Sequence, residues 1–379
     1  MSVQPVLLAS DVLLAILLMA LVAYLVHVRQ QPPLQATWRR VTRTALGRVA
    51  GTVLALYLTV GVLDSLHYRP ALPAQGGQAV QYSNEVLSVL DAVLTPLRTG
   101  VEKTYSAPMA THLYAKETVT LASGEVVRVA PPLKHWHLLG TDKVGQDVLY
   151  LSLKSIRTGL LIGTLTTLIM LPFAVTLGLA AGYFGGRVDD AIQYLYTTLN
   201  SIPGVLLIAA AVLVVQVQIE MHPDWFDSAA ARADVRLLAL CAILGMTSWT
   251  GLARLLRAEA LKLRELEFVH AARAFGVGHA GIVRRHILPN VGHLIVISVV
   301  LDFSGLVLAE AVLSYVGAGV DPATASWGNM INGARLELAR EPIVWWQLAA
   351  AFGFMFVLVL AANLFADAVK DAFDPRTAR

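Results

Sequence analysis

The sequence predicts an all-α fold, a polytopic membrane helix bundle. Of the 379 residues, 56% are hydrophobic and 15% are charged, and the mean hydropathy is +0.63. This composition excludes a soluble globular chain of that length. Apolar runs of about 20 residues recur, and a helix of that length crosses the hydrocarbon core of a bilayer. The seven expected spans are 6–28, 46–66, 159–184, 191–217, 235–256, 291–316 and 343–366.

The charged residues between the spans give the expected orientation. Segment 29–48 contains five arginines and no acidic residue, and short loops rich in Lys and Arg stay in the cytoplasm. The N-terminus is therefore expected outside and the C-terminus in the cytoplasm. Residues 1–10 contain no Lys or Arg. The first span thus lacks the basic start of a secretory signal and is interpreted as an uncleaved helix.

The segment between the second and third spans, 67–157, is expected outside the membrane. Residues 67–134 combine mixed charges with six prolines, which favours small strands and turns. The alternative is a cap that receives a soluble binding protein. A helix N-capped by Thr141 or Asp142 is expected to lie along the outer interface and lead into the third span. His135 and His137 have no third ligand nearby in the sequence, which favours packing over a metal site.

The chain lacks the sequence motifs of common active sites. It contains no Gly-x-x-x-x-Gly-Lys-Ser/Thr phosphate loop, no His-Glu-x-x-His and no Gly-x-Ser-x-Gly. Its one cysteine, Cys241, lies in an apolar run, which excludes a disulfide framework within the chain. We therefore expect no catalytic residue, metal ion or cofactor here, and ATP-driven work would need ATP and Mg on separate subunits.

Polar residues inside two spans are candidates for lining a translocation path. Asp302 lies near the centre of span 291–316 and Glu310 nearer its outer end. Charged groups at such depth usually face the bundle interior or water. Asn200 and Pro203 interrupt span 191–217, and a break of this kind is tolerated next to a cavity or neighbouring helices. A structural hydrogen bond for the acids, and a simple packing kink for the break, are equally compatible with the sequence.

The longest polar segment between two spans in the C-terminal half is 259–290. Its arginines and lysine place it in the cytoplasm. Good helix-forming residues predict a helix from Glu259 to Phe275, after which Gly276 and Gly278 predict a turn. A second short helix is expected from His279 to Leu288, ended by Pro289. A helical elbow, a pair of helices joined by a turn and connected at both ends to membrane spans, could bind a soluble partner and transmit its movement to those spans.

Part of this segment resembles the cytoplasmic coupling loop of ABC-importer membrane subunits. The matching residues are Ala271-Ala272, Gly276 and Leu288-Pro289, while His270 stands where the family pattern has Glu and His286 where it has Ile. Three further stretches resemble the peptide-permease branch of that family: LGTDKVGQDVL at 139–149, with Gln146 in place of the usual Arg, SWGNM at 326–330, and Asp374-Pro375-Arg376.

The resemblance covers 46–379 and implies a type I ABC-importer permease fold. Segment 46–66 would be the first family-type span, 67–157 a long extracytoplasmic loop with its interfacial helix, and 158–379 a permease core of five spans that includes the coupling loop, 258–290. Family members usually have six spans. Segment 1–45, with its extra N-terminal span and basic cytoplasmic loop, is therefore an addition.

The resemblance also implies function and partners. The chain would be a subunit of a bacterial inner-membrane importer of dipeptides, oligopeptides or peptide-like compounds, with nickel chelates and peptide antibiotics left open as cargo. Its partners would be a second homologous permease, two ATP-binding subunits, an extracytoplasmic solute-binding protein and membrane lipid, without nucleic acid. The residues expected at the ATPase contact are Glu267, His270, Ala271, Ala272, Arg273, Gly276, Leu288 and Pro289.

Two other functions fit parts of the sequence. An ion-coupled secondary transporter would use Asp302 and Glu310, but the sequence has no inverted repeat and no matched pair of broken helices. A membrane-embedded enzyme would use histidines such as His270, His286 and His293, but these have no spaced third ligand and no buried carboxylate partner. Co-purification of an ATPase would separate the importer from both alternatives.

Overall fold

A computed structural model describes residues 3–72, 81–120, 126–339, 341 and 343–373. The described part is mostly helical, and seven of its helical stretches are long and apolar enough to cross a membrane, which confirms the expected number of spans. They are Ala9–Gln30, Ala45–Asp64, Val148–Phe184, Gly204–Met221, Ala229–Leu263, His279–Val316 and Trp346–Ala372.

The long helix α6 (Val148–Phe184) organises the bundle, because it packs against α3 (Ala45–Asp64), α9 (Ala229–Ser248), α10 (Thr250–Leu263), α13 (Leu288–Val316) and α15 (Trp346–Phe373). Gly178 and Gly182 allow the backbone of α10 to approach closely. A Cβ atom on Gly182 would lie 2.5 Å from the carbonyl oxygen of Arg257. Small residues are the usual means of bringing membrane helices into contact.

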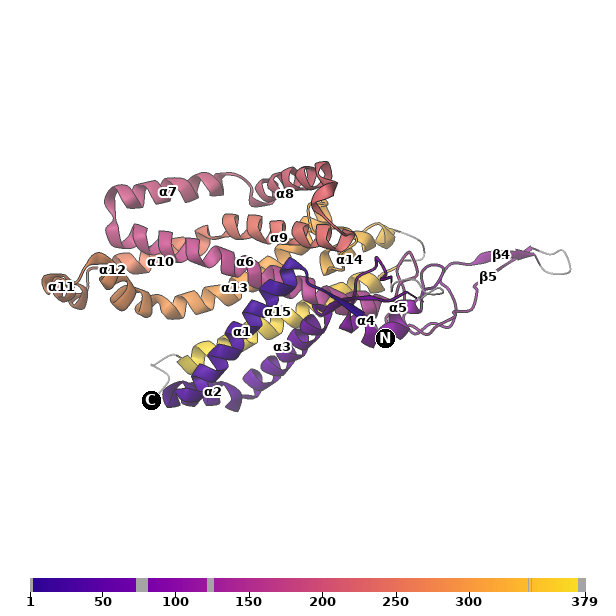
Figure 1. Cartoon of the computed structure of the whole chain (residues 1–379), viewed down its shortest axis with the longest axis horizontal. Coiled ribbons are helices and arrows are strands. Elements are labelled where there is room, and N and C mark those ends of the chain that lie inside the picture. The colour runs from indigo at the N-terminus through magenta and orange to yellow at the C-terminus, as the bar shows by residue number, and fades with distance from the viewer. Residues whose placement is uncertain (1–2, 73–80, 121–125, 340, 342, 374–379) are drawn as a thin grey trace.

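The molecule has two distinct ends along its long axis (Figure 1). We call the "α11 end" the one with α2 (Pro32–Arg43), α11 (Glu267–Ala274) and α12 (His279–Ile282). The "α14 end" contains α14 (Trp327–Ala334), the short helices α4 (Val89–Val93) and α5 (Thr95–Thr99), and five short strands. Strand β2 (His67–Pro70) pairs with β1 (Val3–Val6) and with β3 (Leu87–Ser88), and β4 (Glu117–Thr120) pairs with β5 (Val126–Val129).

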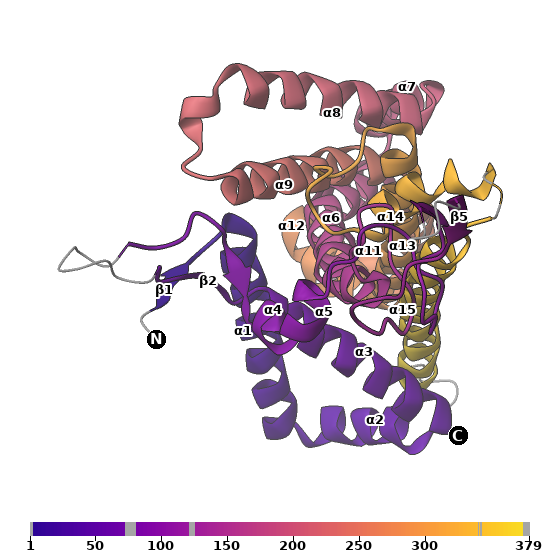
Figure 2. The same cartoon turned by 90° about the vertical axis from the view of Figure 1, so that its right-hand side faces the viewer.

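The N-terminal helix α1 (Ala9–Gln30) is joined to the bundle by a buried polar cluster near its first turn. Arg157 of α6 donates from Nη2 to Asp11 Oδ1 over 2.7 Å, and Asp11 Oδ2 lies 2.8 Å from His67 Nδ1. Ser10 hydrogen-bonds to Asp234 of α9. Beyond this cluster most of α1 is exposed, and α2 connects it to α3 in a wide loop (Figure 2).

The helix start expected at Thr141 or Asp142 differs from the structure. Asp147, rather than Thr141 or Asp142, caps α6 by accepting the N–H of Tyr150, and α6 then runs on into the membrane span, so no separate interfacial helix precedes it. Thr141 cannot begin a helix because its hydroxyl is engaged with the backbone of Thr104 and Ser106. Gly145, at φ +79°, also breaks the chain direction before Asp147.

The expected break in span 191–217 is present. Helix α7 (Gly186–Ser201) ends before Pro203, and α8 (Gly204–Met221) begins after it. Pro203 cannot donate a helical hydrogen bond, and a proline disfavours helical geometry in the preceding residue. Ile202 is accordingly extended, at φ −93° and ψ 131°. Only α8 of this pair is apolar enough to be a candidate span.

The helices of 259–290 were also predicted with wrong boundaries. Helix α10 ends at Leu263 and α11 begins at Glu267, so the single helix expected up to Phe275 is two helices separated by a turn. Pro289 does not end a helix. A π-helical turn at Val283–Ile287 precedes it, and α13 continues through it. The wider π turn accommodates a residue that lacks the N–H group and would crowd the preceding turn.

Candidate functional site

Helix α11 and the turn after it project at one end of the molecule (Figure 1). The N–H of Phe275 donates to Ala271 O, that of Gly276 to Arg273 O, and that of Val277 to Ala272 O, so the carbonyl groups of the last turn are satisfied. Gly276 has a φ of +81°, and its position adopts the left-handed conformation that glycine favours. This left-handed conformation explains why the turn that the sequence predicts occurs at Gly276.

The two predicted alanines of α11 lie on opposite faces. Val269 and Ala272 are buried in a cluster with Leu256 and Ala260 of α10 and with Ile282 of α12. Ala271 is exposed. Ala272 therefore contributes to the packing of its own chain and has little surface left for a partner.

The exposed face of α11 combines charge with apolar surface. Glu267, His270 and Arg273 are exposed, and Phe275, which was not predicted as a contact residue, is 88% exposed. The guanidinium carbon of Arg273 lies 5.9 Å from the centre of the Tyr183 ring. A hollow of about 410 Å³ next to this face is lined by His270, Arg273 and residues of α6. The sequence signal for Phe275 was available, since it directly precedes the turn glycine.

Leu288 and Pro289 lie at the base of this region, in the first turn of α13. Leu288 is half-buried against the same cluster as Val269, whereas Pro289 is exposed. The structure therefore brings Leu288 together with the buried face of α11, and Pro289 marks the return of the chain into the bundle.

An ion pair braces the same end. Arg257 of α10 forms a two-pronged pair with Asp189 of α7, at 2.5 Å from Nε to Oδ1 and 2.6 Å from Nη2 to Oδ2. Hydrogen bonding to Arg257 holds the pKa of the Asp189 carboxyl below its ordinary value. Arg264, in the turn between α10 and α11, donates to the carbonyl oxygen of Gly182 over 3.3 Å. These contacts connect the base of α11 to α6 and α7.

The four candidates for a translocation path have different surroundings. Asp302 is half-buried in the middle of α13 and makes no hydrogen bond or ion pair with any residue in the described ranges. Glu310 is buried, accepts a hydrogen bond from Ser314 Oγ over 2.7 Å, and also bonds with Ser326 and with the N–H of Gly328. A carboxylate at the start of α14 is favoured by the partial positive charge of a helix N-terminus.

The other two candidates lie at the break between α7 and α8. Asn200 accepts a hydrogen bond from Thr250 Oγ1 over 3.1 Å, which ties α7 to α10. Pro203 is exposed and is the residue directly before α8. The structure does not bring these two together with Asp302 and Glu310 in one described cluster of polar contacts.

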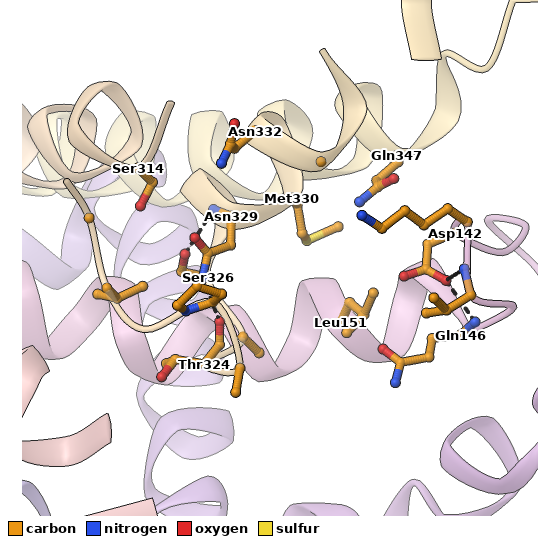
Figure 3. A pocket seen from close by; sticks show the side chains of 18 of the residues that line it. Asp142, Gln146, Leu151, Ser314, Thr324, Ser326, Asn329, Met330, Asn332 and Gln347 are labelled. Carbon is orange, nitrogen blue, oxygen red and sulfur yellow. Dashed lines mark hydrogen bonds between the residues drawn. The ribbon is translucent and has the colours of Figure 1, made fainter. Parts of the chain in front are cut away.

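A polar cavity at the α14 end was not predicted as a site. It has a volume of about 940 Å³ and lies among the loop before α6, helices α8, α9 and α14, and the start of α15. Figure 3 shows Asp142 and Gln146 on one side, and Asn332 and Gln347 across from them. We call this space the α14 cavity. Its walls include parts of LGTDKVGQDVL and SWGNM, which the sequence marked only by resemblance.

Seven candidate spans, a helical elbow at one end and a polar cavity at the other define a polytopic membrane protein. Comparison with known proteins identifies its family. Residues 174–379 match the family of binding-protein-dependent transport system inner membrane components, and this chain belongs to that family. It is a multi-pass inner-membrane transport subunit of a class without its own ATP site, and such systems work with an ATPase and a binding protein.

Two relatives are similar along most of their length. The dipeptide transport system permease protein DppC of Lactococcus lactis subsp. cremoris is 28% identical over 342 residues, which cover 90% of each chain. A Brucella suis protein named as a peptide permease is 33% identical over 312 residues, 81% of this chain and 94% of its own. A solved structure of the inward-facing MetNI methionine ABC transporter covers 59% of this chain and 97% of the other, at 16% identity and a TM-score of 0.43.

Proposed function

We propose that this chain is the permease subunit of an ATP-driven importer of peptides or peptide-like compounds. It would form half of the translocation path and couple to a separate ATPase through 259–290. Family membership supports the importer, and the names of the relatives from Lactococcus lactis and Brucella suis support peptides as the cargo. The observation on which the coupling depends is the two-faced helix α11, exposed on one side and packed into the bundle on the other.

The arrangement of charge supports a cytoplasmic α11 end. Arg39, Arg40 and Arg43 lie on α2, and Arg284 and Arg285 follow α12. Positive residues in short segments next to membrane spans favour the cytoplasm. Strand β1 belongs to the α14 end, so the N-terminus would be outside. Helix α15 ends at the α11 end, so the C-terminus would be cytoplasmic.

Coupling follows from the two faces of α11. The exposed face, with Glu267, His270, Ala271, Arg273 and Phe275, would bind in a groove of an ATP-binding subunit. The buried face, with Val269 and Ala272, shares one packed cluster with α6, α10 and α12. Because packed interfaces move as units rather than deforming continuously, a displacement of α11 would shift these helices together.

The remaining assembly follows from the family. ATP and Mg would be bound by two ATP-binding subunits at the α11 end, and a solute-binding protein would deliver cargo at the α14 end. A second, homologous permease would complete the path. Asp302, Asn200 and Pro203 are proposed to line that path, and Glu310 to hold α14 at its outer mouth. Closure of the ATP-binding subunits must favour one arrangement of the helices by differential affinity.

The test is reconstitution of the membrane complex with its ATP-binding subunits and binding protein. We expect dipeptide or tripeptide uptake that requires ATP and is lost in Ala271→Arg and Gly276→Pro, while both variants still insert in the membrane. Ala272→Arg is the matched control at a buried position, and it should lower the thermal stability of the chain itself. Uptake that persists without ATP and stops with a protonophore would favour an ion-coupled transporter instead.

A further inference from the structure

The α14 cavity contains two deeply buried polar side chains with unused hydrogen-bonding capacity. Gln347, at the start of α15, is 7% exposed and forms no hydrogen bond with another residue in the described ranges. Asp142 is 8% exposed, and the bonds it accepts from the N–H groups of Val144 and Gln146 both end on Oδ1. Figure 3 shows its other oxygen, which has no dashed line, pointing into the cavity.

No cation forms an ion pair with Asp142 in the described ranges. Lys154, which lines the same cavity, pairs with Asp64 and Asp91. Arg236 pairs with Asp321 and Glu220. The adjacent Lys143 is exposed and also lines the cavity; it makes no ion pair with a described residue, but its charge favours the ionised form of Asp142. Burial raises the pKa of Asp142 above its ordinary value, as expected for a carboxyl without a paired cation.

The side chains of Asp142 and Gln347 both line the cavity, so a ligand bound there could supply hydrogen-bond partners for them. A carboxylate oxygen and an amide oxygen that line one cavity match a primary ammonium, which has three N–H donors and no acceptor. The bond to Asp142 would join two opposite charges and would be the strongest of the set. Gln146, exposed on the same loop, offers a further amide oxygen.

We propose that Asp142 and Gln347 form a subsite for the N-terminal ammonium group of a peptide in transit, an assignment that rests on the proposed peptide import. The rest of the cavity suits a peptide backbone. Asn332 is half-buried and has no hydrogen-bond partner in the described ranges. Asn329 uses its amide nitrogen on Asp321 and Thr324, which leaves its oxygen for an N–H donor.

A basic side chain of the solute-binding protein could bring the same charge, but the depth of the subsite favours the peptide. Both Asp142 and Gln347 are more than nine-tenths buried, and the cavity continues past them with amide groups that a docking side chain would not need. Its volume of about 940 Å³ is in the range of small-molecule sites.

The experiment measures peptide binding to the complete membrane complex, in nanodiscs and without the solute-binding protein. The probes are trialanine and N-acetyl-trialanine, and the signal is intrinsic tryptophan fluorescence, because Trp327 and Trp346 belong to the helices that line the cavity. We expect wild type to bind trialanine at least about tenfold more tightly than the acetylated peptide. Asp142→Asn and Gln347→Leu should each remove most of this preference and leave the weak binding of the acetylated peptide unchanged.

Asn at position 142 keeps the oxygen that holds the loop, so the charge is the main change. Lys116→Gln, at an exposed lysine outside the lining of the cavity, is the control, and it should retain the preference for the free amine. Equal binding of the two peptides by wild type would overturn the subsite, as would an unchanged preference in Asp142→Asn. An Asp142→Asn variant that instead loses affinity only for the solute-binding protein would assign the carboxylate to docking and also overturn it.

The outcome is separable from that of the proposed function. If peptide import is wrong, the wild-type complex with its binding protein will not take up peptides at all. If only the subsite is wrong, ATP-dependent peptide uptake will be intact and the amine preference will be absent.

Discussion

Phe275→Ala is the sharpest test of the proposed coupling surface. The ring is 88% exposed at the end of α11, so this chain gains almost nothing from it when alone. Burying a phenylalanine side chain against a partner contributes about 1.5–3 kcal/mol. Scaled by the exposed fraction of 88%, truncation should weaken binding of the ATP-binding subunit by roughly 1.3–2.6 kcal/mol, which is about ten- to ninetyfold in Kd.

The assay has two readouts on the same purified permease in nanodiscs. Fluorescence polarisation of labelled ATP-binding subunit gives Kd, and thermal unfolding gives Tm. Phe275→Ala should raise Kd and leave Tm unchanged. Val269→Ala, at a position with 0% exposure in the packed cluster, should lower Tm because it leaves a cavity. Leu7→Ala, 80% exposed at the opposite end, should change neither quantity.

The reasoning is refuted if Phe275→Ala binds the ATP-binding subunit as tightly as wild type. It is also refuted if Tm falls as much in Phe275→Ala as in Val269→Ala, because the ring would then stabilise the fold rather than the complex.

Three other predictions concern the bundle. Asp189→Asn weakens the two-pronged pair with Arg257, which is only part-buried, and should destabilise the chain by about 1–2 kcal/mol in thermal unfolding. Because the pKa of Asp189 is lowered in the folded protein, this stabilisation is complete above the ordinary Asp value of 3.8 and is lost as the pH falls through the folded value. A wild-type stability that does not change with pH over that range would contradict it. Gly182→Ala should lower the free energy of unfolding by about 1–3 kcal/mol, because the new Cβ atom meets the backbone of α10. Gly251→Ala, whose Cβ would have nothing within 4 Å, should be neutral or stabilising. Equal Tm values for the two variants would show that the close approach is unimportant. Glu310→Ala should lower Tm, because it removes the hydrogen bonds that hold the start of α14. Asp302→Asn removes no contact with a described residue, so it should leave Tm unchanged and alter uptake. The reverse pattern would assign the structural role to Asp302 and the path to Glu310.

The number of spans and the site of the elbow could be predicted because both are local properties. About 20 apolar residues suffice to make a spanning helix whatever its neighbours are. The turn at Gly276 and the break at Pro203 likewise follow from the conformations that glycine and proline allow. The boundaries failed where a side chain had a tertiary partner, as Thr141 does with Thr104 and Ser106.

The sequence by itself determined that this chain is a seven-span membrane protein with a polar helical elbow, since hydrophobic length and backbone preference act residue by residue. Only the tertiary structure decided that Ala271 faces out and Ala272 faces in, and that Phe275 stands free at the tip. It alone placed Asp142 and Gln347, more than 200 residues apart in the numbering, around one cavity. The physical reason is that a side chain's partners depend on how distant helices pack, and helical periodicity does not specify which face a neighbour will cover.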